Sequence, residues 1–243
     1  MTAKSQPVST KATKVLRRKR YVRSSSYRRD SYPWLRVLDG IAAKRIFDIV
    51  FSLAVLILFS PLYLVLTLAI AISSPGPIFY IQKRVGKNYK LFRCIKFRTM
   101  VDDADAVLAS IMANSPELQS EFETNFKLKN DPRITPIGKF LRLTSLDEFP
   151  QFWNVLKGDM SVVGPRPLVP EEVCKYGDRM KKVLTIRPGI TGLWQVSGRN
   201  DIPYPRRVQM DVYYVTARSW LMDFWIILKT IAVVIFPSDN GAY

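Results

Sequence analysis

The pattern of apolar and polar positions divides the chain into three parts. Residues 1–40 are rich in serine and basic residues and show no apolar periodicity, which predicts a disordered arm. Residues 49–72 form a run of 24 residues without a charge. Residues 75–243 alternate short apolar stretches with turn-forming residues, as a folded domain does. The pattern therefore predicts an arm over residues 1–40, a membrane segment over residues 44–74 and a domain over residues 75–243.

The apolar run is long enough to cross a bilayer, but Ser60 and Pro61 divide it near its middle. Pro61 cannot donate a hydrogen bond to the carbonyl of Ile57, and its ring crowds that turn, so we expect a sharp kink. Basic residues flank both ends of the run, whereas a spanning helix carries its excess on one side. These features favour a re-entrant helix that breaks at Ser60-Pro61 and returns to the same side. A straight span with a proline kink is the alternative.

The remaining pattern predicts a mainly α fold with one small β-hairpin. Strands at residues 78–82 and 91–100 flank a turn, and Lys96 and Arg98 share one face of the second strand. This basic face either holds phosphate or is solvated. Helices are expected at residues 102–113, 116–126, 137–143, 171–185, 206–218 and 220–236, and another near Asp147. We interpret 137–143 and 220–236 as amphipathic helices at a membrane interface, with a core position as the alternative for 220–236.

Charge and composition limit the chemistry. Residues 1–45 contain 13 Lys and Arg against two Asp, which suits anionic lipid or nucleic acid, and the apolar run that follows favours lipid. The chain has no histidine, which excludes His-based triads and most zinc sites. Cys94 and Cys174 lie 80 positions apart without a disulfide framework, as in a reducing compartment.

The candidate chemistry centres on Asp147 and Glu148, which precede an apolar helix that we expect to end at Gly158. Ser145 and Glu148 fit an S-x-x-E capping box, and a helix N-terminus favours carboxylates and phosphates. Arg166 lies between two prolines, so its guanidinium is carried on a stiff backbone that suits bidentate phosphate binding. Taken alone, the carboxylate pair is more typical of a helix cap followed by a solvated turn.

Two further motifs are candidates. The loop at residues 187–200 presents Trp194, Gln195 and Arg199, which suits a nucleotide or sugar contact and equally a packed turn. Asp103 and Asp105 match the metal-binding D-x-D of many glycosyltransferases, although two acids that open a helix normally interact with its dipole.

Together, the motifs resemble one known family, the bacterial sugar transferases, and within it the monotopic polyprenyl-phosphate hexose-1-phosphate transferases. The resemblance runs from about residue 44 to the end of the sequence and fits the short form with only the catalytic unit. Larger members carry further transmembrane helices, and nothing in the family accounts for the basic arm. The segments that carry the resemblance are KRIFDI, the Ser60-Pro61 break, GPIFYIQKRVG, FRCIKFRTM, SLDE, NVLKGDMSVVGPRP, RPGITGLWQVSGR and DVYYV.

The resemblance implies an enzyme that transfers a hexose-1-phosphate from a nucleotide diphosphate sugar, usually a UDP-sugar, to undecaprenyl phosphate and releases UMP. This is the first membrane step of exopolysaccharide or related glycoconjugate synthesis. It implies that Asp147 is the nucleophile of a covalent phosphosugar intermediate, that Glu148 assists, and that Mg²⁺ is held at this pair beside the diphosphate. Arg142 and Arg166 correspond to phosphate-handling positions.

Asp147 and Glu148 are therefore the expected catalytic and metal-binding residues. The expected substrate-binding and phosphate-binding residues are Lys96, Arg98, Arg142, Pro165, Arg166, Pro167, Gln195 and Arg199. The expected partners are polyprenyl phosphate, a nucleotide diphosphate sugar and the lipid surface at the cytoplasmic face of a bacterial inner membrane. We expect no nucleic acid, and a homodimer is left open.

Two other classes of protein compete with this interpretation. A non-catalytic, basic membrane-surface tether that binds anionic lipid or nucleic acid explains the arm and the apolar run. It gives no role to Asp147, Glu148 or Arg166. A metal-dependent glycosyltransferase that uses Asp103 and Asp105 would release UDP rather than UMP, so the released nucleotide separates the two enzymatic classes.

Overall fold

The computed structural model describes residues 40–125, 128 and 130–235 and divides into two compact units, residues 1–44 and 45–243. Residues 1–39 of the predicted arm lie outside the described residues, as do Phe126 and Phe236, the predicted ends of two helices. Within the described part, helices predominate and the strands form two small sheets, which confirms a mainly α fold with a hairpin.

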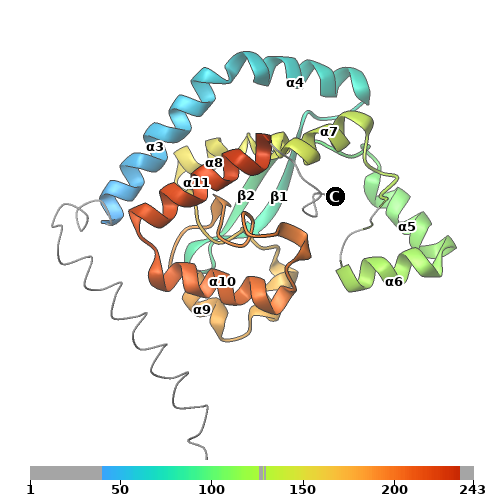
Figure 1. The fold of residues 1–243 in the computed structure, drawn as a ribbon. Helices are drawn as coiled ribbons and strands as arrows, with labels where there is room; N and C mark the ends of the chain where they lie inside the picture. The colour runs from blue at the N-terminus through green and yellow to red at the C-terminus, as the bar shows by residue number, and fades with distance from the viewer. Residues whose placement is uncertain (1–39, 126–127, 129, 236–243) are drawn as a thin grey trace, which may run out of the picture. The chain divides into compact units, whose positions relative to one another are not determined.

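The helices and strands (Figure 1) are α3 (Ile41–Leu58), α4 (Ser60–Ser73), β1 (Phe79–Val85), β2 (Leu91–Phe97), α5 (Ala104–Asn114), α6 (Pro116–Asn125), α7 (Pro136–Thr144), α8 (Gln151–Lys157), β3 (Ser161–Val163), α9 (Arg179–Val183), β4 (Gly189–Thr191), α10 (Tyr204–Ala217) and α11 (Trp220–Ile235). Four short 3₁₀ segments complete this part of the chain: η1 (Lys87–Tyr89), η2 (Leu146–Glu148), η3 (Pro170–Tyr176) and η4 (Arg199–Asp201).

The apolar run bends where the sequence predicts it. α3 and α4 meet at an angle of 63°, and Phe59 lies at the junction with Pro61 in the first turn of α4. Because Pro61 has no N–H to donate, the helix cannot continue straight through this turn. Among the described residues, no single helix is long and apolar enough to cross a membrane. The bent pair reaches the necessary length and composition when its two helices are taken together.

Two polar side chains of α3 fasten it to the domain. Arg45 donates to two carbonyls in the last turn of α8, from Nη1 to Val155 at 2.6 Å and from Nη2 to Leu156 at 2.9 Å. Asp48 is buried and accepts hydrogen bonds from Ser161 Oγ and Val162 N, both at 3.0 Å. A cation at the C-terminal end of α8 and a carboxylate at the start of β3 satisfy backbone groups that would otherwise lack partners. The apolar helix is therefore anchored through a polar face.

The hairpin of β1 and β2 is antiparallel and is held against α8 by one side chain. Asn154 donates to the carbonyl of Arg93 at 2.7 Å and accepts from Ile95 N at 3.0 Å. The solvated-face alternative for Lys96 and Arg98 is wrong, because the side chain of Lys96 is only 19% exposed and Arg98 is 6% exposed. Both cations face protein groups.

The pairing of β3 with β4 was not predicted from the sequence. These strands have three residues each and run parallel, with Ser161 opposite Gly189 and Val163 opposite Thr191. Their continuations come so close that a Cβ on Gly189 would overlap the backbone nitrogen of Gly164. Glycine is therefore required for packing at this crossing, which fixes the segment that follows β3.

Helix boundaries differ from the sequence prediction in two places. The single helix expected at residues 171–185 is divided into η3 and α9, because Gly177 adopts a φ of +51° between them. The helix expected near the carboxylate pair starts later, since η2 holds the pair and α8 begins only after Pro150. Its predicted end at Gly158 is confirmed, with a φ of +90°.

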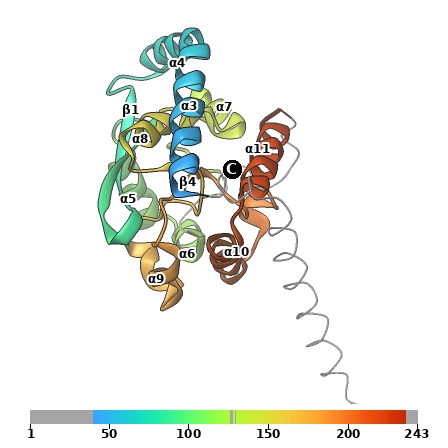
Figure 2. The same ribbon diagram turned by 90° about the vertical axis from the view of Figure 1, so that its left-hand side faces the viewer.

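The core lies between the hairpin and the last helix. α8 contacts β2 and β3, and α11 contacts β3 and β4. Figure 2 shows this order, with β1 on the left and α11 on the right. On the inner side of α11, Asp223 accepts from Tyr214 Oη at 2.6 Å, and Ile226 and Ile227 are buried. One face of the predicted helix at residues 220–236 is therefore packed into the core. Its exposed apolar residues are Leu221, Phe224, Trp225, Leu228, Ile231 and Ile235, and their contact with a membrane interface stays a prediction.

Candidate functional site

The carboxylate pair lies in a 3₁₀ turn between two helices. After α7, Ser145 adopts a left-handed φ of +58°, and η2 then presents Asp147 and Glu148. The predicted capping box is wrong, because Ser145 makes no side-chain cap bond here. Its hydroxyl instead accepts a hydrogen bond from Arg199 Nη2 at 3.3 Å. The turn, rather than a helix cap, sets the direction of the two carboxylates.

Lys96 from β2 and Arg166 from the segment after β3 contact the pair. Lys96 Nζ lies 2.6 Å from Glu148 Oε1 and 3.7 Å from Asp147 Oδ2. Arg166 Nη1 lies 3.4 Å from the same Glu148 oxygen. The side chains of Asp147 and Glu148 are only 14% and 17% exposed, so these ion pairs are largely shielded from water. Glu148 therefore contacts both cations, at 2.6 and 3.4 Å, whereas Asp147 has only the longer contact with Lys96, at 3.7 Å.

The two carboxyl groups differ in their affinity for protons. Burial raises the pKa of Asp147; the charge of Lys96 opposes this shift, and the charge of Glu148 adds to it. Burial also disfavours the charge of Glu148, but Lys96 and Arg166 outweigh it and hold the pKa of Glu148 below its usual range. Glu148 is thus a permanent anion, while Asp147 is the more basic carboxylate and, when ionised, the better nucleophile.

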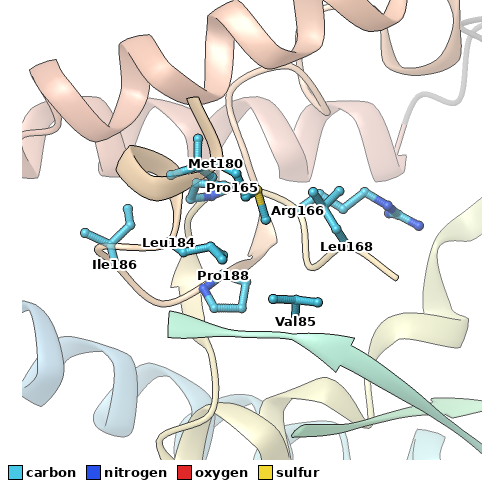
Figure 3. A pocket seen from close by; sticks show the side chains of 9 residues that line it. Val85, Pro165, Arg166, Leu168, Met180, Leu184, Ile186 and Pro188 are labelled. Carbon is cyan, nitrogen blue, oxygen red and sulfur yellow. The ribbon is translucent and has the colours of Figure 1, made fainter. Parts of the chain in front are cut away.

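Arg166 is carried on a fixed backbone, as predicted from its two prolines. The carbonyl of Pro165 accepts from Gly189 N at 2.8 Å, and that of Pro167 accepts from Arg84 Nη1 at 3.0 Å. A pocket of about 10 Å³ adjoins this segment and is lined by Val85, Pro165, Arg166, Leu168, Met180, Val183, Leu184, Ile186 and Pro188. Figure 3 shows the guanidinium of Arg166 extending away from the apolar side chains. The pocket is too small for a substrate, and its lining supports the backbone of Arg166.

Two more predicted cations approach the carboxylates. Arg142, in the last turn of α7, donates from Nε to Thr99 Oγ1 at 3.0 Å. Burial lowers the pKa of Arg142, whereas the charge of Asp147 opposes that shift. Burial likewise lowers the pKa of Arg199, and Glu148 opposes it. The structure thus brings together Lys96, Arg142, Asp147, Glu148, Arg166 and Arg199.

Arg98 and Gln195 make other contacts. Arg98 donates to the carbonyl of Pro75 at 2.7 Å and to the carbonyl of Ser74 at 2.6 Å, so its guanidinium closes the loop after α4. These contacts give Arg98 a structural role, and its expected binding of phosphate stays a prediction. Gln195 donates from Nε2 to the carbonyl of Ile190 at 3.1 Å, and its Oε1 is buried without a hydrogen-bond partner among the described residues.

Sequence reasoning missed Arg84 and Glu172. Arg84 Nη1 lies 4.0 Å from Glu172 Oε2, and the charge of Arg84 acts on Arg166 and Glu148. The available signal was the alternation along β1, where Arg84 shares its face with the half-buried Gln82 while Lys83 points to solvent.

The charge balance of the site suits an anionic substrate. Five cations, Lys96, Arg84, Arg142, Arg166 and Arg199, face three carboxylates, Asp147, Glu148 and Glu172. An excess of fixed positive charge favours a ligand with two or more negative charges, such as a diphosphate. Burial raises the pKa of the Cys94 thiol, which leaves the carboxylates as the better candidates for a nucleophile.

The described residues contain no group of three or more His, Cys, Asp or Glu side chains that could hold a metal ion. Asp103 and Asp105 are exposed, at the N-cap and in the first turn of α5, which fits an interaction with the helix dipole. Asp147 and Glu148 offer two carboxylates. Mg²⁺ is commonly bound by one or two carboxylates with water and substrate phosphates, so this pair fits an ion that shares the substrate.

The chain matches the bacterial sugar transferase family over residues 40–237. The protein therefore belongs to this family of enzymes, which confirms the resemblance drawn from its motifs. The match includes the bent helix pair, the carboxylate pair and the proline-flanked arginine.

Three curated relatives are similar over most of the chain. The undecaprenyl-phosphate galactose phosphotransferase of Salmonella typhimurium is 50% identical over 217 residues, which cover 86% of this chain and 44% of that protein. The UDP-galactose-lipid carrier transferase of Erwinia amylovora is 45% identical over 215 residues, which cover 86% of this chain and 44% of that protein. The exopolysaccharide production protein ExoY of Rhizobium meliloti is 45% identical over 209 residues, which cover 86% of this chain and 91% of that protein. The chain thus spans less than half the length of the first two relatives and most of the third.

Proposed function

We propose that this protein transfers a hexose-1-phosphate from a nucleotide diphosphate sugar, typically a UDP-sugar, to undecaprenyl phosphate and releases UMP. The proposal rests on the surroundings of Asp147, whose carboxylate is enclosed, comparatively basic and placed among fixed cations. The names of the Salmonella and Erwinia relatives, with undecaprenyl phosphate in one and UDP-galactose in the other, support the two substrates. The product would be the first lipid-linked sugar of an exopolysaccharide or related glycoconjugate, in line with the ExoY relative.

In the first step, the carboxylate of Asp147 attacks the phosphorus that bears the sugar. A bond forms between a carboxylate oxygen and this phosphorus, and the bond from phosphorus to the bridging oxygen of the diphosphate breaks. UMP leaves with the electron pair, and Lys96 and Arg166 balance the charge on the phosphate oxygens. In the second step, an oxygen of undecaprenyl phosphate attacks the same phosphorus and the carboxylate of Asp147 is released.

Glu148 assists without changing its own bonds. It stays ionised beside Lys96 and Arg166, so it holds both cations in position. Asp147 and Glu148 would also hold a Mg²⁺ ion that arrives with the donor. Such an ion would neutralise diphosphate charge and favour the carboxylate form of Asp147.

The bent pair of α3 and α4 supports a site at a membrane surface. Its exposed side chains are largely apolar, while Arg45 and Asp48 tie α3 to the domain. A re-entrant arrangement would keep residues 75–243 on the cytoplasmic side of a bacterial inner membrane, where nucleotide sugars are made. The lipid acceptor would then approach from the bilayer.

The nucleotide that is released tests the function. Purified protein in detergent with a UDP-hexose and undecaprenyl phosphate should release UMP, and Asp147→Asn should abolish release while the protein remains in the membrane fraction. Release of UDP, lost on Asp105→Ala, would favour the D-x-D glycosyltransferase. Absence of any nucleotide release, with membrane binding intact, would favour the tether.

A further inference from the structure

The segment that carries Arg166 is short of backbone donors. Pro165 and Pro167 have no N–H group, so the backbone on either side of Arg166 is held through carbonyls. The carbonyl of Pro165 accepts from the first backbone N–H of β4 at 2.8 Å. The carbonyl of Leu168 accepts from Val85 N at 2.9 Å, where the end of β1 bridges to the segment. The backbone of β1 therefore reaches Leu168 and leaves the carbonyl of Pro167 to another donor.

Arg84 of β1 supplies that donor from its side chain. Its Nη1 donates to the carbonyl of Pro167 at 3.0 Å, and its Nη2 donates to Gln82 Oε1 at 2.5 Å. Gln82 and Arg84 occupy alternate positions of β1, so both side chains lie on the same face of the strand. The side chain of Arg84 is only 13% exposed, and its Nε is buried without a hydrogen-bond partner among the described residues. Two acceptors therefore orient this guanidinium.

Glu172 of η3 balances the charge of Arg84. Its Oε2 lies 4.0 Å from Arg84 Nη1 and accepts from Val169 N at 3.3 Å. Arg84 therefore binds the residue before Leu168, and Glu172 binds the residue after it. Burying a positive charge to bind a carbonyl costs free energy that a neutral donor would not cost. Stability of the fold alone therefore does not account for an arginine at this position.

We propose that Arg84 is a positioning residue that directs the guanidinium of Arg166 at Glu148 and at the donor phosphate. The inference rests on the proposed function. The ring of Pro167 fixes its φ, so a shift of the Pro167 carbonyl also turns the backbone that carries Arg166. Arg84 holds this carbonyl and so fixes the direction of Arg166, whose Nη1 lies 3.4 Å from Glu148 Oε1. A guanidinium that is fixed before the donor binds needs no reorganisation during phosphate transfer.

A double-mutant cycle on UMP release tests this role. The full chain in detergent is used in excess over UDP-galactose or UDP-glucose, so that the first chemical step is followed. Arg84→Met should slow this step by about ten- to a hundredfold, because a small misplacement of a reacting group costs that much. In an Arg166→Lys background no planar fork is left to direct, so Arg84→Met should slow the step by less than about threefold. Lys83→Met, on the exposed side of β1, is the matched control and should change neither background.

The cycle separates positioning from a purely structural role, because damage to the fold lowers the rate by the same factor in both backgrounds. Equal factors, or an unchanged rate in Arg84→Met, would overturn the inference and leave the proposed function intact. Arg84→Lys keeps the charge but lacks the planar fork that spans Pro167 and Gln82, so a full rate in this variant would overturn the inference as well.

Thermal unfolding of each variant shows whether it is folded. Should Arg84→Met not fold, Gln82→Met takes its place in the cycle, because it removes one of the two acceptors that orient Arg84 and leaves the charge of Arg84 unchanged. Equal factors for Gln82→Met in the two backgrounds would then overturn the inference. Failure of the unsubstituted protein to release UMP from either UDP-hexose would instead overturn the proposed function, and the inference with it.

Discussion

Lys96 on β2 donates to Glu148 in η2 at 2.6 Å, across 52 positions of sequence. The same ammonium lies 3.7 Å from Asp147, so one cation serves both carboxylates with unequal strength. Because Glu148 holds Lys96 in place, the charge beside Asp147 is fixed before any substrate arrives. A fixed cation needs no reorganisation during a transfer of negative charge, which is the condition for electrostatic catalysis.

Lys96→Met should shift the acid limb of the activity toward higher pH. Asp147 attacks only as a carboxylate, so activity is present above its pKa and is lost as the pH falls through it. Burial already raises this pKa and Lys96 opposes the shift, so removal of the cation raises it further. Loss of one charge-assisted contact should also slow UMP release by roughly one to two decades at neutral pH.

The pH profile of UMP release in a single turnover measures both effects for Lys96→Met. Lys90→Met is the matched control, because this lysine is exposed next to the same strand. An acid limb that stays at its original pH in Lys96→Met would show that the ionisation of Asp147 does not limit the reaction.

Local sequence patterns predicted the parts of the fold that depend on single residues. Pro61 marked the bend between α3 and α4, and Gly158 marked the end of α8, because each has a backbone restriction or freedom that acts within one turn. Gly177 divides a segment that the sequence predicts as one helix, because the apolar periodicity continues on both sides of this residue. The pairing of β3 with β4 was not predictable, because strands of three residues carry too little pattern.

The site was predicted as a set of motifs, and its geometry was not. Asp147 and Arg166 were found from residue type and neighbours. Their connection through Glu148 depends on long-range packing. Arg98 carries the same charge as Lys96 and follows the same alternation along the chain, yet its guanidinium binds the carbonyls of the loop after α4. The residue type alone therefore does not predict whether a basic side chain is available to a substrate or is bound to backbone carbonyls.

Arg166→Lys should impair activity far more than a charge-conserving change normally does. The guanidinium is held between Pro165 and Pro167 and contacts Glu148, and an ammonium on a flexible stem cannot reproduce its planar fork. Loss of one charge-assisted pair in the transition state is worth roughly 1.5–3 kcal/mol, or about one to two decades in turnover.

Steady-state UMP release measures the effect, with Arg179→Lys on the exposed side of α9 as the matched control. Equal turnover in wild type and Arg166→Lys would mean that Arg166 binds no reacting phosphate.

Asp48→Ala should destabilise the protein by about 1–3 kcal/mol, because it leaves a buried backbone N–H at Val162 and the hydroxyl of Ser161 without their shared acceptor. Thermal unfolding in detergent measures the loss, and Asp105→Ala, which removes only an exposed contact with the dipole of α5, should lower the midpoint far less. An Asp48→Ala protein as stable as wild type would mean that the polar face of α3 does not hold it to β3.

The arm and the domain should lie on the same, cytoplasmic side of the membrane. A straight span would put residues 1–45 outside with 13 Lys and Arg, against the positive-inside preference. Replacing Ser60-Pro61 with Ala-Leu restores the missing backbone donor in an uncharged run of 24 residues, which is long enough to cross. We expect this variant to shift toward a spanning form and to lose activity, because Asp147 would no longer lie at the depth of the lipid phosphate.

Cysteine labelling in intact cells with a membrane-impermeant maleimide decides between the two topologies. Cys174 is exposed and Cys94 is buried, so Cys174 reports the side of the domain, and Ser25→Cys in a Cys174→Ser background reports the side of the arm. In the re-entrant arrangement neither cysteine reacts until the cells are permeabilised, whereas the Ala-Leu variant should expose the arm cysteine and keep Cys174 protected. If the arm cysteine of the protein with Ser60-Pro61 intact reacts from outside, Pro61 only kinks a spanning helix and the re-entrant arrangement is wrong.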